Sequence, residues 1–277
     1  MFKPLNAGRV TAARWSSIVV SLLALMAASA GTAMADVNAY EVAGNTSFGT
    51  IDLTTGVYTQ IGVSGILMSG LGETGGLIYG GAFLTDTVYT VNPATGALTL
   101  IGTTGGPNFG DFGSTLTGLY AIDLAGYGGN ANLWSINPAT GAATLIGPTG
   151  LTYSSPIGMS DNSAILYVTN GPLLYSLNTT TGAATLVGNT GTVGTGGMVT
   201  LGGTLYGGVE GPLQVATLDP VTGAATLGPL ETGAPSNFWA LAADPPTGTA
   251  APEPGYIALL VLGMAGMLAV RRTRARA

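Results

Sequence analysis

The chain has 277 residues, enough for a sizeable buried core, and it carries a net charge of −6 with no histidine and no cysteine. All seven Lys and Arg residues lie before residue 15 or after residue 270, so residues 36–250 contain twelve Asp or Glu and no cation. Such a surface repels nucleic acid and anionic lipid, which excludes both as partners of this stretch. Because residues 36–250 contain no histidine, cysteine or lysine, they cannot form a Ser-His-Asp triad, a cysteine nucleophile, a Schiff-base lysine or a histidine-ligated metal site.

The N-terminal residues have the pattern of a secretory signal peptide. A basic segment precedes an apolar stretch over residues 18–28, and small residues that suit signal peptidase follow at Ala33 and Ala35. We therefore expect residues 1–35 to be removed by signal peptidase. The mature chain would then begin at Asp36 and lie beyond the inner membrane.

Five copies of one short segment organise residues 36–243. In each copy an alternating strand leads into a tight turn, and the Asp or Asn that opens the turn recurs at intervals of 40 to 45 residues. The turn-opening residues are Asp52, Asn92, Asn137, Asn178 and Asp219. This period is that of one blade of a β-propeller, and the turn residues themselves are expected to be structural.

Four of the five repeats also contain the other strands that a four-stranded blade requires. The turn hairpin would supply the two outer strands, and a short strand with one tyrosine precedes it. These tyrosines are Tyr40, Tyr79, Tyr120, Tyr167 and Tyr206. We interpret them as packing residues, with a stacking platform for a ligand as the alternative. Innermost strands are expected at residues 65–72, 113–117, 154–159 and 196–201.

The first repeat lacks an innermost strand, whereas the strand at residues 237–242 lacks a repeat of its own. We therefore predict an all-β fold, a five-bladed β-propeller closed by this C-terminal strand, which leaves no open sheet edge at the joint. The alternative is an open β-solenoid with capped ends. Residues 244–250 would form an extended linker. Within the fourth repeat, the sequence Tyr-Val-Thr-Asn at residues 167–170 resembles the YVTN-type propeller repeat of bacterial and archaeal surface proteins.

The C-terminal residues 251–277 contain a Pro-Glu-Pro element, an apolar run over residues 255–270 and an arginine cluster, in that order. As a helix the run would extend ~24 Å, which is short of the ~30 Å hydrocarbon core of a bilayer. The arrangement resembles the PEP-CTERM sorting signal, which an exosortase of Gram-negative bacteria recognises. The motif residues are Pro252, Glu253, Pro254, Arg271 and Arg272. The resemblance implies a short transmembrane helix that anchors the protein transiently, with a protein anchored at both ends as the alternative.

Four carboxylates are expected on one face of the propeller, where the loops from second to third strands and from blade to blade emerge. They are Asp86, Asp111, Glu210 and Glu231. Carboxylates could stay solvated, bind Ca²⁺ together with backbone carbonyls, or hydrolyse glycosides. Because no Ca²⁺-loop, phosphate-binding or nucleotide motif accompanies them, we expect no cofactor, with Ca²⁺ as the alternative.

Three classes of function remain open at this point. The first is a non-enzymatic propeller at the cell surface or in the extracellular matrix, processed by signal peptidase and exosortase and in contact with extracellular polysaccharide. The second is a carbohydrate- or calcium-dependent binding protein, and the third is a carboxylate glycoside hydrolase. The PEP-CTERM resemblance implies an association with exopolysaccharide and biofilm and so favours the first class.

Overall fold

The computed structural model describes most of the repeat region. It covers residues 37–244 with gaps at residues 45, 84, 124–128, 153–156 and 236–237. From Asn38 onward the described residues belong to one compact unit that contains twenty β-strands and no helix, so the predicted all-β class is confirmed. Accordingly, no helix capable of spanning a membrane occurs in the part that the structure covers. The signal peptide, nearly all of the linker and the sorting signal lie outside the described residues.

The strands form three four-stranded sheets and one eight-stranded sheet. The first sheet contains, in spatial order, β20 (Phe238–Ala243), β1 (Asn38–Ala43), β2 (Ser47–Asp52) and β3 (Val57–Val63). The second contains β4 (Met68–Thr74), β5 (Leu77–Ala82), β6 (Thr87–Val91) and β7 (Leu98–Thr103). The third contains β8 (Phe109–Thr115), β9 (Gly118–Asp123), β10 (Asn130–Ile136) and β11 (Ala143–Thr152).

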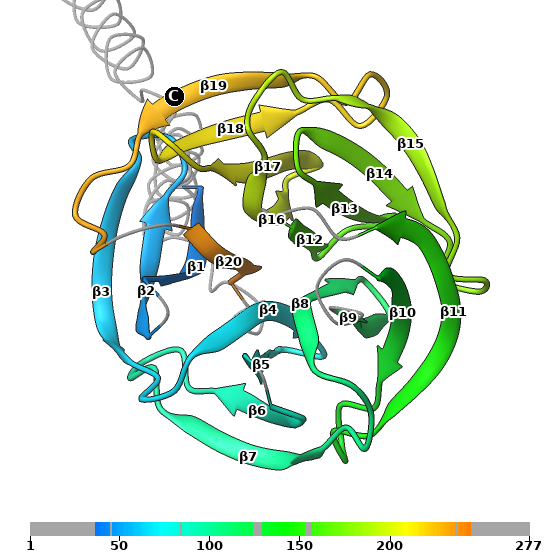
Figure 1. Ribbon diagram of the computed structural model, residues 1–277. Coiled ribbons are helices and arrows are strands. Elements are labelled where there is room, and N and C mark those ends of the chain that lie inside the picture. Colours follow the sequence, from blue (N-terminus) through cyan, green and yellow to red (C-terminus); the bar gives the residue numbers. More distant parts are fainter. Residues whose placement is uncertain are drawn as a thin grey trace, which may run out of the picture. The chain divides into compact units, whose positions relative to one another are not determined.

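The eight-stranded sheet consists of two antiparallel halves. One half is β12 (Ile157–Asp161), β13 (Leu166–Asn170), β14 (Leu173–Leu177) and β15 (Ala184–Asn189). The other is β16 (Thr195–Leu201), β17 (Thr204–Val209), β18 (Gln214–Leu218) and β19 (Ala225–Leu230). A short parallel pairing of β12 with β16 joins them. Figure 1 shows all the sheets arranged radially, with β4, β8, β12, β16 and β20 innermost and β3, β7, β11, β15 and β19 outermost, as in a β-propeller.

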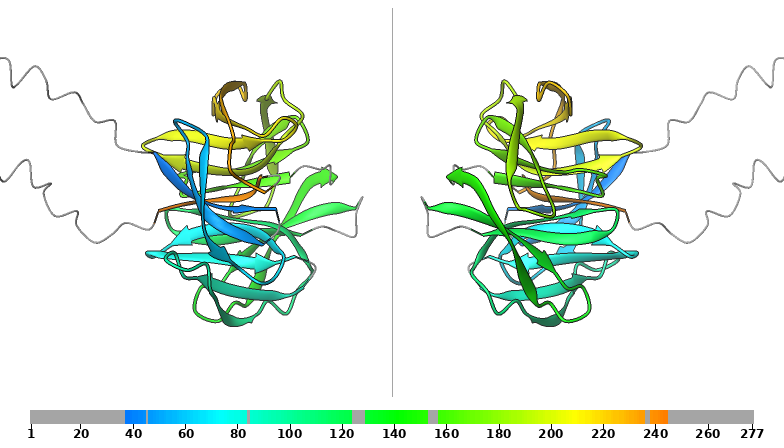
Figure 2. Two further views of the ribbon diagram at one scale, coloured as in Figure 1. Left: turned by 90° about the vertical axis from the view of Figure 1, so that its left-hand side faces the viewer. Right: turned by 90° about the vertical axis from the view of Figure 1, so that its right-hand side faces the viewer.

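The two ends of the repeat region meet in one sheet. Strand β1 pairs with β2 on one side and with β20 on the other, and Ala39 lies opposite Ala243. Both views in Figure 2 show the orange β20 beside the blue β1. The predicted pairing of the C-terminal strand with the first repeat is therefore present, and Val37 and Asp244, the ends of the described chain, are neighbours.

The turn that closes each outer hairpin forms as its sequence predicts. In the third repeat the side chain of Asn137 accepts a hydrogen bond from the Ala139 N–H at 2.9 Å, and Gly141 has a φ of 74°. That positive φ suits glycine, which lacks a Cβ. Each blade therefore ends in a hairpin whose geometry is dictated by four or five consecutive residues.

These turns also lock neighbouring blades together. A Cβ built on Gly102 in β7 would lie 2.2 Å from the Thr140 carbonyl oxygen, which belongs to the turn of the next blade. The same contact recurs between Gly62 and Thr95, Gly147 and Thr181, and Gly188 and Thr222, while the turn glycine Gly56 approaches Leu230 at the joint. Only glycine allows such a close approach, which accounts for the glycine at this position of the outer strands.

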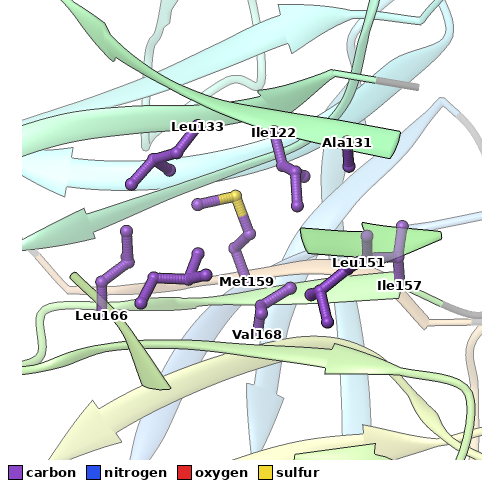
Figure 3. Close-up of a cluster of buried hydrophobic side chains, with 9 residues drawn as sticks. Ile122, Ala131, Leu133, Leu151, Ile157, Met159, Leu166 and Val168 are labelled. Carbon is purple, nitrogen blue, oxygen red and sulfur yellow. The ribbon is translucent and has the colours of Figure 1, made fainter. Parts of the chain in front are cut away.

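Apolar clusters fill the spaces between adjacent sheets. Figure 3 shows one of them, with Met159 of β12 between Leu133 of β10 on one side and Leu166 and Val168 of β13 on the other. Of the tyrosine series, Tyr79 and Tyr167 are buried within such clusters, and Tyr40 stacks on Phe48 with ring centroids 5.4 Å apart. For these residues the packing interpretation is confirmed.

Candidate functional site

The predicted acidic residues do not gather into one site. Asp86 lies between β5 and β6, Glu210 directly after β17, and Glu231 between β19 and β20, all partly buried. In the described part of the chain, no three acidic, histidine or cysteine side chains converge where they could hold a metal ion.

Asp111 differs from its predicted position on the loop face. It lies inside β8 and is 1% exposed, and its carboxylate accepts hydrogen bonds from the backbone N–H groups of Phe112, at 2.7 Å, and Met159. Burial raises its pKa well above the usual value, although these two bonds act in the opposite direction. The physical reason for its position is that the innermost strands leave N–H groups unpaired near the axis, and buried N–H groups need acceptors.

A second buried carboxylate, which the sequence analysis missed, joins four innermost strands. Asp161 at the end of β12 accepts hydrogen bonds from the Glu73 N–H of β4 at 2.6 Å, the Ala243 N–H of β20 at 2.7 Å and the Ser114 hydroxyl of β8. Burial raises the pKa of Asp161 to about 7, against the opposing effect of these hydrogen bonds. We call Asp161 and these three donors the axial hub.

The neighbouring residue extends the axial hub to the fifth innermost strand. Asn162 has a φ of 52°, an unusual value outside glycine. Its N–H donates to the Ser114 hydroxyl at 2.9 Å, and its side-chain amide donates to the Thr200 carbonyl of β16 at 3.3 Å. The Asp-Asn pair at the end of a buried strand could have indicated this hub from the sequence. The same pair, however, is typical of turns that end strands.

The axial hub also defines the two ends of the ring. Because Glu73, Ser114 and Ala243 all lie near the C-terminal ends of their strands, the innermost strands end on the same side. Strands alternate in direction within each antiparallel group of four, so the loops that carry Asp86 and Glu210 emerge at the opposite end. Ala243, the last residue of β20, lies at the hub end.

A third acidic feature lies where the two ends of the repeat region meet. Glu41 of β1 is fully buried beside Glu231, and the four carboxyl oxygens of the pair meet no other described hydrogen-bond partner. The pKa of Glu41 is raised first by burial, then by the charge of Glu231 and by a hydrogen bond between the two carboxyl groups. Burial raises the pKa of Glu231 to about 7, against the lowering effect of that hydrogen bond. The sequence analysis missed Glu41, although a lone acid in the apolar strand Asn38–Ala43 is a visible signal.

An open hollow of about 530 Å³ lies between the first and second sheets. Its lining includes Phe83, Tyr89 and the threonines Thr46, Thr85 and Thr87. Asp86 stands between two of these threonines in the sequence. Aromatic rings beside hydroxyl groups are a chemistry that can receive a sugar.

Comparisons with known proteins complete this description. No protein family and no curated protein matches the chain. Among solved structures, a protein of unknown function from Bacteroides thetaiotaomicron is similar, with 17% identity, a TM-score of 0.45, and 60% of this chain and 44% of that one covered. This chain therefore spans less than half of that protein.

Two further structures are similar at the same level. One chain of a nidogen–laminin complex shows 14% identity and a TM-score of 0.49, covering 75% of this chain and 81% of that one. Regucalcin, a calcium-binding protein from Agrobacterium tumefaciens, shows 17% identity and a TM-score of 0.45, covering 71% of each chain.

Proposed function

We propose that the chain is an exported, non-enzymatic propeller of five blades that acts at the cell surface or in the extracellular matrix after sorting by an exosortase. The blade count is supported by the five turn-opening residues and by the division of the strands into five antiparallel groups of four. Closure of the ring is supported by the pairing of β1 with β20.

The positions of the carboxylates support the non-enzymatic part of the proposal. Asp111 and Asp161 engage both of their oxygens with strand N–H or hydroxyl donors, and the oxygens of Glu41 and Glu231 are enclosed. Glycoside hydrolysis needs two carboxyl groups that reach opposite sides of a bound sugar. Of the predicted acidic residues, only Asp86 and Glu210 remain available as the carboxyl pair of a glycosidase. A binding or structural role therefore fits the arrangement better than catalysis.

The path of the chain supports attachment at one end of the ring. Residues 245 onward continue from Asp244, next to the axial hub, so a C-terminal anchor would hold the ring by its hub end. The loops with Asp86 and Glu210 would then point away from the membrane. This orientation leaves the loop face free to contact extracellular polysaccharide.

The test is the mass of the protein as the producing organism releases it. The released form is expected to lack residues 1–35 and the arginine cluster at Arg271 and Arg272. A Glu253→Ala variant should keep its C-terminal segment and stay with the membrane fraction, as should the unchanged protein in a strain without exosortase. Recovery of the protein from the cytosol with both ends uncut would refute the proposal.

A carbohydrate-binding role is the second candidate, and the hollow lined by Phe83 and Tyr89 favours it. Calorimetry with the producer's own polysaccharide should then show heat that a Tyr89→Ala variant loses. Tyr175 holds the same position in the fourth repeat, so Tyr175→Ala is the matched control and should keep the heat. Equal heats for both variants, or none for the unchanged protein, would remove this candidate.

A further inference from the structure

The buried pair of Glu41 and Glu231 lacks any partner of opposite charge. Glu41 is 0% exposed, and the oxygens of both carboxyl groups are closed to water. Residues 36–250 contain no Lys, Arg or His that could approach them. Two ionised carboxylates cannot stay together in a water-free interior without a compensating positive charge.

Two hydroxyl groups lie on the neighbouring strands of the same sheet. Tyr58 of β3 is 5% exposed, and its hydroxyl lies 3.0 Å from the Ser47 hydroxyl of β2. Glu41 stands opposite Gly49 in the sheet, and a Cβ on Gly49 would lie 2.7 Å from the Tyr58 ring. Because Gly49 has no side chain, the Tyr58 ring can lie over it, beside Glu41.

The backbone brings Glu231 to this group. The next residue, Thr232, pairs with the start of β3, because its carbonyl accepts the Tyr58 N–H and its own N–H donates to the Gly56 carbonyl, both at 2.9 Å. Burial and the charges of both glutamates together raise the pKa of Tyr58 to about 12, against the lowering effect of its hydrogen bond with Ser47. Tyr58 therefore lies within electrostatic reach of both carboxylates.

These groups have the chemistry of a site for a hard divalent cation. The two carboxylates offer four oxygens and the two hydroxyls offer two more, and Ca²⁺ prefers six to eight oxygen ligands. Two negative charges neutralise one divalent ion. Because the described part of the chain brings together only two anionic side chains here, the remaining ligands must be neutral oxygens.

We propose that Glu41 and Glu231, with the hydroxyls of Tyr58 and Ser47, hold one Ca²⁺ ion. The ion would connect β1, β2 and β3 with the segment that leads into β20. It would therefore stabilise the joint at which the two ends of the repeat region meet. This site is independent of the sorting and location of the protein.

The test measures thermal unfolding of the mature domain at pH 7.5 after treatment with a chelator, with and without added Ca²⁺. At a concentration of ~100 times the dissociation constant, Ca²⁺ should raise the melting temperature by roughly 5–10 °C. Glu41→Gln and Glu231→Gln should each abolish this shift. Asp219→Asn is the control and should keep it, because Asp219 lies in an exposed turn where three other repeats have Asn.

Direct binding keeps the test valid if a glutamate variant fails to fold. Equilibrium dialysis of the unchanged domain should find one Ca²⁺ ion per chain, and Tyr58→Phe, which keeps the ring and removes the hydroxyl, should bind it more weakly. Two results would overturn the proposal. One is a domain that binds no Ca²⁺ and whose loss of stability between pH 5 and pH 8 becomes smaller in Glu41→Gln, since the pair then shares a proton. The other is a Ca²⁺ shift that survives in Glu41→Gln, since the ion then binds elsewhere.

Discussion

Replacing Asp161 by alanine tests whether the axial hub stabilises the fold. The change would leave three buried donors without an acceptor: the N–H groups of Glu73 and Ala243 and the hydroxyl of Ser114. Each such group costs about 1–3 kcal/mol. The carboxylate is itself costly to bury, as its raised pKa shows, so we expect a net loss near the lower end of the sum, about 3–5 kcal/mol.

The assay is thermal unfolding of the mature domain at pH 5. A loss of about 3–5 kcal/mol corresponds to a fall in melting temperature of roughly 6–20 °C for a domain of this size. Asp219→Asn is again the control, because it leaves the axis untouched. If Asp161→Ala melts at the same temperature as this control, the hub does not stabilise the fold and the reasoning is wrong.

An isosteric change separates the hydrogen bonds from the charge. Asp161→Asn keeps one acceptor oxygen and places an NH₂ where the other was, so about 1–3 kcal/mol should be lost. The folded pKa of about 7 lies above the usual 3.8, so the contribution of Asp161 is complete below pH 3.8 and disappears as the pH rises through 7. The deficit of Asp161→Asn relative to the unchanged domain should therefore be larger at pH 5 than at pH 8.

Three further predictions concern the whole domain. Because burial raises the pKa of Asp111 and Asp161, urea unfolding should show a more stable domain at pH 5 than at pH 8, and the opposite order would contradict this account. Gly188→Ala would place a Cβ 1.9 Å from the Thr222 carbonyl oxygen and should lower the free energy of unfolding by about 1–3 kcal/mol. Gly106→Ala is the control and should change the urea midpoint little, because the nearest atom to its Cβ, in Trp134, is 3.6 Å away. Truncation before β20 exposes the edge of β1 and should lower the melting temperature sharply, whereas an unchanged melt would favour an open solenoid.

Features that depend on neighbouring residues could be predicted from the sequence. The outer hairpins follow from alternation over five or six residues and from turns such as Asn137 to Gly141, in which one residue contacts another two to four positions away. The pairing of β20 with β1 could be predicted because one repeat lacked a strand and another strand lacked a repeat. Innermost strands were predicted less accurately, and β8 begins at Phe109 rather than at residue 113, because both faces are buried and no alternation marks their limits.

Only the tertiary structure decided what the acidic residues do. Asp161 contacts Glu73 and Ala243, which are 88 and 82 residues away, and Glu41 faces Glu231 from the other end of the repeat region. Asp111, predicted for a loop, became an acceptor inside β8 for the same reason. Near the axis, strands from different repeats approach with little or no pairing, so many N–H groups there need a side-chain acceptor. Which side chain accepts depends on how the ring assembles, and this cannot be predicted from a local sequence pattern.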